Sequence, residues 1–211
     1  SKTFSDILNL PTSAITSVDV DSEGRIWIAD LAINGRIYRQ RQKNSSTYDI
    51  IQVPNVGPNG PPPFTLAIGP DDTAYYIDNQ FNLYRKTKVQ ANFSKFIAGA
   101  YVRVAVGAAN DVWVIATEGI VFQLVNGNLE RRPPTGTQPN SSFDIGGGPD
   151  GSIYVTFLFP SDSLPTLYKW NVSNRSFDRV NRSAWQVDVA PNGRPWILDP
   201  FPPSSTAYQA K

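Results

Sequence analysis

The stretch Ser183–Pro200, SAWQVDVAPNGRPWILDP, decides the fold. Trp185, Val187 and Val189 alternate with other residues before a tight Pro-Asn-Gly turn. A second run of apolar and aromatic residues, centred on Trp196, follows the turn. Alternation at a period of two on either side of a turn is typical of an antiparallel hairpin. The stretch therefore predicts a β-hairpin with which the rest of the chain can be compared.

Weaker copies of this unit recur along the whole chain. Four precede the opening stretch: VDVDSEGRIWIADLAINGRIYRQ (Val18–Gln40), LAIGPDDTAYYIDNQFNLYRK (Leu66–Lys86), VAVGAANDVWVIATEGIVFQL (Val104–Leu124) and FDIGGGPDGSIYVTFLFPSDSLPTLYKW (Phe143–Trp170). The first aromatic residues of the five units are separated by 48, 38, 41 and 42 residues: Trp27, Tyr75, Trp113, Tyr154 and Trp196. Repeats of roughly 40 residues with about four strands each are typical of β-propeller blades.

The repeat predicts an all-β fold: a five-bladed β-propeller of four-stranded antiparallel blades. The fifth unit ends at Lys211 before its fourth strand, and the N-terminal segment Lys2–Leu10 looks like that missing strand. Pairing of this segment with Thr206–Gln209 would close the ring and remove an open sheet edge. We therefore expect a single domain, 1–211, with blades at about 14–54, 62–98, 101–134, 141–181, and 183–211 plus 1–11.

Composition excludes several classes of function. The chain has 19 basic and 18 acidic side chains without a long run of one sign, so we expect no nucleic-acid partner. It contains no Cys, His or Met, which excludes disulfides and thiol chemistry and leaves zinc only oxygen ligands. Its apolar runs are too short for membrane insertion. No signal peptide is visible, although a mature chain could have lost one. We expect neither a cofactor nor a metal.

Carboxylates in the inner strands have two interpretations. Asp19, Asp144 and Asp188 could bind a cation near the axis, because hard cations take oxygen ligands. We favour the alternative that each accepts backbone N–H bonds from a neighbouring blade. The fourth inner strand is ambiguous, because Gly146–Gly148 allows a shift in register by two residues.

A second set of carboxylates follows the first aromatic by three residues: Asp30, Asp78 and Asp199. These side chains could accept hydrogen bonds from sugar hydroxyls or form a metal rim. Asp also caps turns by accepting bonds from its own backbone, which needs no ligand. We keep them as candidate binding residues and favour the turn role.

Aromatic residues outside the repeated core position are the better candidates for binding. Trp27, Trp113 and Trp196 recur inside a strand, which predicts packing between blades. Trp185 and Phe64 lie three residues before the small or acidic inner-strand residue, and Phe143 joins them in the shifted register. Trp170 has no aromatic counterpart in the other units. We keep these residues as candidate binding residues and, for Trp185, favour a structural role.

Catalysis finds little support in the sequence. Without His or Cys, a general base at neutral pH would need a strongly shifted carboxylate or Lys. The usual nucleophilic triads are absent, and GGGPDG precedes a strand rather than a helix. We expect a protein without enzyme activity; a metal-dependent propeller lyase or lactonase is the less favoured alternative.

The five units resemble tectonin-type β-propeller repeats, with SAWQVDVAPNGRPWILDP and FDIGGGPDGSIYV…LYKW as the best examples. The resemblance implies a lectin related to the tachylectin group, with one weak glycan site per blade or between blades. Repetition would turn weak sites into avidity for clustered glycans. The leading Trp of that repeat is kept only at Trp185, with Phe64 and, in the shifted register, Phe143 as substitutes. VDVDSEGRIWIAD…GRIYR also resembles NHL-type repeats, which implies a protein-interaction scaffold as the alternative.

N-glycosylation sequons are more frequent than chance predicts. Six Asn-x-Ser/Thr sequences occur, at Asn44, Asn92, Asn140, Asn171, Asn174 and Asn181. They favour a secreted glycoprotein, while the missing cysteines leave a cytoplasmic location as the alternative. The sequence thus predicts a non-catalytic, carbohydrate-binding lectin whose partners are glycans, with a protein partner as the alternative. Its candidate site residues are Trp185, Trp170, Phe64, Phe143, Asp30, Asp78 and Asp199.

Overall fold

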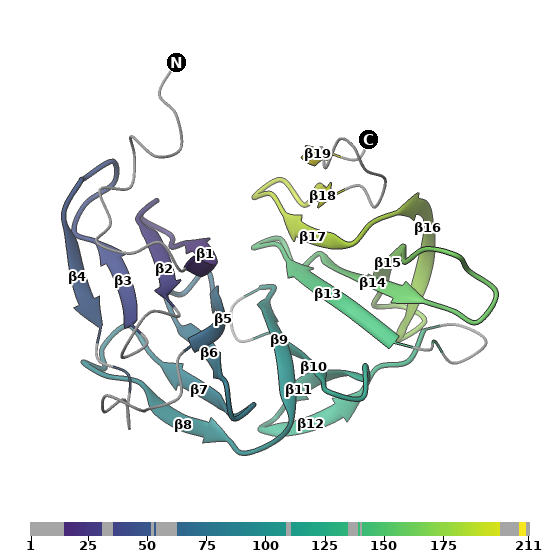
Figure 1. Cartoon of the computed structure of the whole chain (residues 1–211), viewed down its shortest axis with the longest axis horizontal. Coiled ribbons are helices and arrows are strands. Elements are labelled where there is room, and N and C mark those ends of the chain that lie inside the picture. The colour runs from purple at the N-terminus through teal and green to yellow at the C-terminus, as the bar shows by residue number, and fades with distance from the viewer. Residues whose placement is uncertain are drawn as a thin grey trace. The chain divides into compact units, whose positions relative to one another are not determined.

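The computed structural model describes residues 15–30, 36–51, 53, 63–108, 111–134, 139, 141–198 and 207–209. These residues form antiparallel strands and turns and contain no α-helix (Figure 1). Accordingly, no helix among them is long and apolar enough to cross a membrane. The all-β prediction is confirmed for this part of the chain.

The strands form five sheets, each built from strands that are consecutive in the chain. Four sheets have four strands: β1 (Ile15–Val20), β2 (Ile26–Asp30), β3 (Arg36–Gln40) and β4 (Tyr48–Ile51); β5 (Pro63–Ile68), β6 (Ala74–Asp78), β7 (Leu83–Lys86) and β8 (Ser94–Ile97); β9 (Tyr101–Val106), β10 (Val112–Ala116), β11 (Val121–Val125) and β12 (Asn128–Arg131); β13 (Ser141–Gly147), β14 (Ile153–Leu158), β15 (Thr166–Asn171) and β16 (Ser176–Ser183). The fifth sheet comprises β17 (Gln186–Val189), β18 (Pro195–Leu198) and β19 (Ala207–Gln209). Each sheet draws its strands from one predicted blade, and the part of the fifth predicted blade at residues 1–11 lies outside the described residues.

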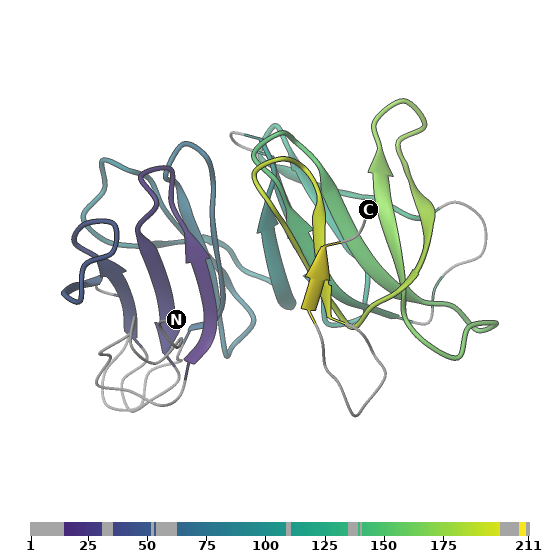
Figure 2. The same ribbon diagram turned by 90° about the horizontal axis from the view of Figure 1, so that it is seen from above.

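The chain divides into two compact units, Ser1–Val102 and Arg103–Lys211. In the first unit, the purple and blue strands of the first sheet lie side by side (Figure 2). The second unit carries the sheets that end with β12, β16 and β19. Residues 2–10 and 206 of the predicted closing pair lie outside the described residues, as does Asp199.

The turn between the first two strands of a sheet has the same geometry in several copies. The amide of Gly193 donates to the carbonyl of Ala190 at 2.9 Å, and the amide of Ala190 donates to the carbonyl of Arg194 at 2.9 Å. Gly193 has a φ of 75°, a conformation that glycine adopts at little steric cost. Gly24 and Gly151, with φ of 75° and 88°, occupy the same place in their turns. The hairpin predicted from Pro-Asn-Gly is therefore confirmed.

Pairing with the repeated aromatic resolves the register of the fourth inner strand. Asp19 pairs with Trp27 and Asp188 pairs with Trp196, whereas the residue opposite Tyr154 is Gly146. A Cβ at Gly146 would lie 2.9 Å from the Cα of Asp188, so the close approach of two inner strands requires glycine. The shifted register is thus the correct one, and Phe143 is the counterpart of Trp185.

Aromatic side chains fill the core of each unit. In the first unit, Tyr76 stacks on Tyr84 with ring centroids 4.6 Å apart, and Phe93 meets Tyr76 edge-on at 4.8 Å. Trp27 and Trp113 are 2% and 0% exposed, as the repeat predicts. Trp196 departs from the prediction, because 46% of its surface is exposed.

Candidate functional site

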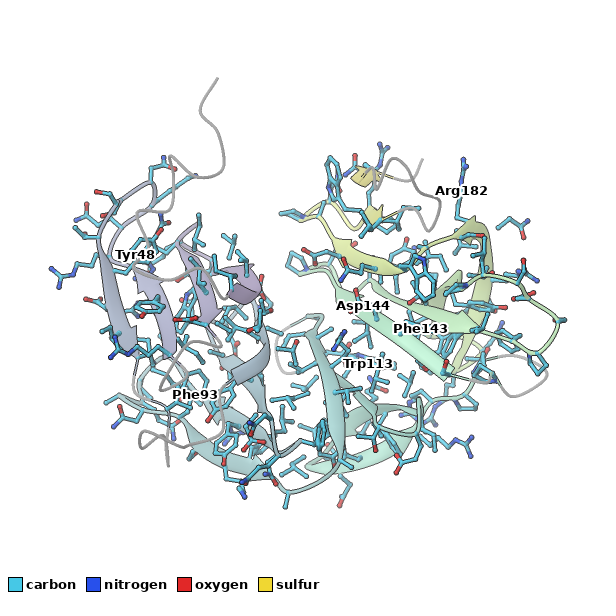
Figure 3. All side chains as sticks on the ribbon, in the orientation of Figure 1. Tyr48, Phe93, Trp113, Phe143, Asp144 and Arg182 are labelled. Atoms are coloured by element: carbon cyan, nitrogen blue, oxygen red, sulfur yellow. The ribbon has the colours of Figure 1, made fainter. Side chains whose placement is uncertain are left out.

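Five side chains at the inner strands of the second unit form what we call the aromatic–ionic site: Arg103, Phe143, Asp144, Trp185 and Asp188. Arg103 lies on β9, Phe143 and Asp144 lie on β13 (Figure 3), and Asp188 lies on β17. Trp185 directly precedes β17. The strands place these residues together because β13 packs beside β17, as the approach of Gly146 to Asp188 shows.

The aromatic half of the site is a pair of rings from neighbouring sheets. The rings of Phe143 and Trp185 meet edge to face, with centroids 5.0 Å apart and planes at 83°. The backbone amide of Trp185 donates to the carbonyl of Leu198 at 3.0 Å, which fixes the residue at the edge of its sheet. Trp185 is nevertheless 39% exposed. The pair thus presents an anchored indole to solvent.

The ionic half of the site centres on Asp144. One carboxylate oxygen lies 3.3 Å from Nε of Arg103, and the other accepts the backbone N–H of Val187 at 2.9 Å. These contacts favour the ionised form, but desolvation by burial is the larger effect and raises the pKa of Asp144 to about 6. Asp144 therefore carries a carboxyl that changes charge near neutral pH.

Asp188 and Asp19 also engage backbone amides. The carboxylate of Asp188 accepts the N–H of Val189 at 2.8 Å. Asp188 is exposed on its strand, and partial desolvation by neighbouring atoms raises its pKa. In the first unit, Asp19 accepts the N–H of Ile68 from the next sheet at 2.6 Å. For Asp19 and Asp144, the structure therefore shows the bonds between neighbouring sheets that we favoured over a cation site.

The carboxylates predicted at the end of the second strand are buried. Asp78 is fully buried, and its Oδ1 accepts the backbone N–H groups of Gln80 at 3.0 Å and Asn82 at 2.8 Å. Asp30, at the end of β2, is 2% exposed. A sugar cannot reach either carboxylate in this conformation, so Asp78 takes the turn role. Asp199 lies outside the described residues.

Trp170 packs against other side chains of the second unit. Its ring meets Trp113 at 4.9 Å and Phe177 at 5.1 Å, and the guanidinium of Arg132 lies 5.7 Å from its centroid. Trp170 is half-buried, so these contacts cover part of its ring and favour a packing role; its role in binding stays a prediction. Phe64 lies in β5, but its side chain is outside the described part of the chain.

The sequons differ in accessibility. Asn44, Asn92, Asn174 and Asn181 are exposed. Asn171 is half-buried, and its amide nitrogen donates to Asp178 at 2.7 Å while its carbonyl oxygen accepts the N–H of Ser173 at 3.0 Å. Asn140 lies outside the described residues. Four of the predicted sites are therefore open to modification in the folded chain.

Arg103 is the functional candidate that the sequence reasoning missed. It follows Val102, the third unit's counterpart of Phe143 and Trp185, and so occupies the same repeat position as Asp144. Alignment of the five units at this position would have identified a cation and a carboxylate on consecutive sheets. That Arg103 and Asp144 form an ion pair is seen only in the structure.

Comparison with known proteins gives a fold but no family. No protein-family description matches the chain, and no curated protein matches it in sequence. Among solved structures, TolB from Acinetobacter baumannii is similar, with a TM-score of 0.70 at 13% identity over 89% of this chain and 49% of that one. YCF48 from Cyanidioschyzon merolae has a TM-score of 0.58 at 13% identity, over 95% and 72%.

An ancestral GH74 enzyme is also similar, with a TM-score of 0.58 at 16% identity, over 91% of this chain and 30% of the enzyme. YCF48 has in addition been solved bound to D1 peptide, a structure with a TM-score of 0.60 at 12% identity over 94% of this chain and 69% of that one. These proteins are β-propellers, so the chain has a β-propeller fold. It spans about half the length of TolB.

Proposed function

We propose that this β-propeller is a carbohydrate-binding protein and that the aromatic–ionic site is its sugar site. The observation that carries the proposal is the 39% exposed Trp185, held edge-on by Phe143, the residue that directly precedes Asp144 of the Arg103–Asp144 pair. The tectonin-like repeat supports the same function. No catalytic role is assigned to these residues.

The chemistry of the site suits a sugar ring. A pyranose has an apolar C–H face that packs on an indole and hydroxyls that need a few fixed hydrogen-bond partners. Arg103, whose side chain is 31% exposed, supplies N–H donors, and Asp144, at 17%, supplies an acceptor. Because the backbone N–H of Val187 already holds Asp144 in place, little side-chain freedom would be lost on binding.

A glycan array tests the proposal with purified protein and the Trp185→Ala variant. We expect saturable binding by the wild type and binding weaker by about tenfold or more in the variant. Val172→Ala removes an apolar side chain that is 74% exposed elsewhere in the same unit, and it serves as the matched control. Equal binding by wild type and Trp185→Ala, or no saturable signal, would sink the proposal.

A protein partner is the second candidate. It is supported by the NHL-like sequence of the first unit and by the structure of YCF48, a protein of the same fold, bound to D1 peptide. An exposed indole next to an ion pair suits a peptide segment as well as a sugar. An array without glycan signal, together with a pulled-down protein whose binding is lost in Trp185→Ala, would favour this candidate.

The proposal includes a closed five-bladed ring and a secreted glycoprotein. Closure is supported by the sheet that ends with β19, which has three strands among the described residues, while each of the other four sheets has a fourth strand. Deletion of residues 1–11 should then lower the melting temperature, and addition of the free peptide should restore it. Secretion is supported by the exposed sequons at Asn44, Asn92, Asn174 and Asn181. Glycosidase treatment of native protein, followed by mass measurement, tests their use.

We also propose that the protein is not an enzyme, although an ancestral GH74 enzyme shares the fold. The absence of His and Cys from the sequence supports this, because the common general bases and nucleophiles are missing. A metal-dependent lyase or lactonase would need a tightly bound metal. Elemental analysis of pure protein would reveal one.

A further inference from the structure

The turn between β6 and β7 holds a bulky aromatic residue in an unusual conformation. Phe81 has a φ of 65°, a region in which bulky side chains are genuine outliers. In the next sequence repeat, the same place in the turn is taken by Gly119, which has a φ of 73°. Glycine adopts this conformation freely. The repeat itself therefore does not require an aromatic here, and Phe81 is 41% exposed.

The surrounding structure fixes this conformation. The buried carboxylate of Asp78 accepts the N–H of Gln80 at 3.0 Å and the N–H of Asn82 at 2.8 Å, on either side of Phe81. The N–H of Phe81 donates to the carbonyl of Asp78, and its carbonyl accepts the N–H of Tyr101, both at 3.0 Å. Strained residues persist where such contacts over-determine them, and they cluster at ligand-binding positions.

The exposed side chains of the turn carry no charge. Phe81 is flanked by the exposed amides of Asn79 and Gln80, and the nearest carboxylate in the turn, Asp78, is fully buried. An apolar ring beside uncharged donors and acceptors matches a pyranose with free hydroxyls and no charged group. In its sheet the turn lies at the end where β5 begins, because Pro63 pairs with Asp78. Trp185, likewise, lies where its sheet's inner strand begins.

We propose that Phe81, Asn79 and Gln80 form a second carbohydrate site, specific for neutral sugars. This inference rests on the proposed lectin function and adds a site that differs from the first in having no ionic partner. Phe81 supplies the stacking surface, while the two amides contact hydroxyls.

Saturation-transfer NMR with the methyl glycosides of glucose, galactose, mannose and N-acetylglucosamine tests the inference. Wild type, Trp185→Ala, Phe81→Gly and the double variant are compared. Phe81→Gly introduces the residue that Gly119 supplies at the same turn position, and glycine removes the backbone strain at this positive φ. The melting temperature of the variant should therefore equal or exceed that of the wild type. Val89→Gly, which alters a 93% exposed side chain at the β7–β8 turn, is the control.

We expect Trp185→Ala to retain transfer to at least one glycoside, and the double variant to lose it, while Val89→Gly keeps the wild-type signal. If Phe81→Gly changes nothing in either background, the second site is wrong while the proposed function stands. If Trp185→Ala alone abolishes all transfer, the second site is also wrong. If the wild type shows no transfer to any glycoside, both proposals fall together. In the Trp185→Ala background, Phe81→Tyr keeps the aromatic ring, so it should retain the transfer that Phe81→Gly abolishes.

Discussion

Asp21 organises the first turn of the first sheet through one buried carboxylate. Its Oδ1 accepts the N–H groups of Glu23 at 3.1 Å and Arg25 at 2.9 Å. Its Oδ2 accepts Nε of Arg25 at 2.7 Å and the indole N–H of Trp27 at 2.9 Å. This single residue therefore links the turn to the buried Trp that marks the repeat.

Replacement of Asp21 should destabilise the fold. Asp21→Ala leaves the buried indole N–H of Trp27 and two turn amides without their acceptor, at a cost of about 2–4 kcal/mol in the free energy of unfolding. Urea unfolding followed by tryptophan fluorescence measures it. Asp71→Ala, which removes a more exposed turn carboxylate, is the control and should cost less. Equal losses for the two variants would argue against a special role for Asp21.

Asp144 should make stability depend on pH. Its pKa is raised from 3.8 to about 6, so the folded chain binds the proton more tightly than the unfolded chain. The free energy of unfolding should therefore fall as pH rises from about 4 to 6 and then level off, by up to about 3 kcal/mol. Asp144→Asn should lack this component. Melting curves from pH 4 to 7.5 compare the two, and parallel profiles would contradict the assignment.

At the scale of the strand, close packing of neighbouring sheets depends on small residues. Gly146→Ala would bring a Cβ to 2.9 Å from both the Cα of Asp188 and the carbonyl oxygen of Val187. Both atoms belong to the backbone and cannot rotate away, so we expect a loss of about 1–3 kcal/mol in the free energy of unfolding.

Gly127→Ala provides the comparison for this prediction, because nothing lies within 4 Å of its added Cβ and only its φ of 82° opposes the change. It should cost about 1–2 kcal/mol from the backbone alone and leave binding unchanged. Gly146→Ala should also shift Trp185 and weaken sugar binding. Wild-type binding by Gly146→Ala would show that the strand approach does not position the site.

Sequence patterns predicted the strands well because each depends on local alternation and on turn residues. The Pro-Asn-Gly turn and the recurring aromatics were sufficient to place the sheets. They were not sufficient for Asp144, whose partners Arg103 and Val187 come from other sheets. Burial of Asp78 and the ring contacts of the half-buried Trp170 were equally hidden, because they depend on which neighbours cover a side chain. The αL conformation of Phe81 has no sequence signal of its own.

At the scale of the whole molecule, a propeller fold accommodates many functions, so the fold alone does not choose among them. TolB, YCF48 and a GH74 enzyme share the fold at 13%, 13% and 16% identity. Function must therefore be argued from the side chains of this chain, such as Trp185 and its neighbours. Binding at two distinct sites would give avidity for clustered glycans that a single site lacks.

The indole N–H resonance of Trp185 tests the central claim most directly. The chain has five Trp residues, so a ¹⁵N-labelled sample gives a small set of indole signals, and Trp185→Phe identifies the relevant one. On titration with a glycan identified on the array, we predict a saturable shift of the Trp185 signal, while those of the buried Trp27 and Trp113 stay in place. Saturable glycan binding that leaves the Trp185 signal unmoved would contradict the account.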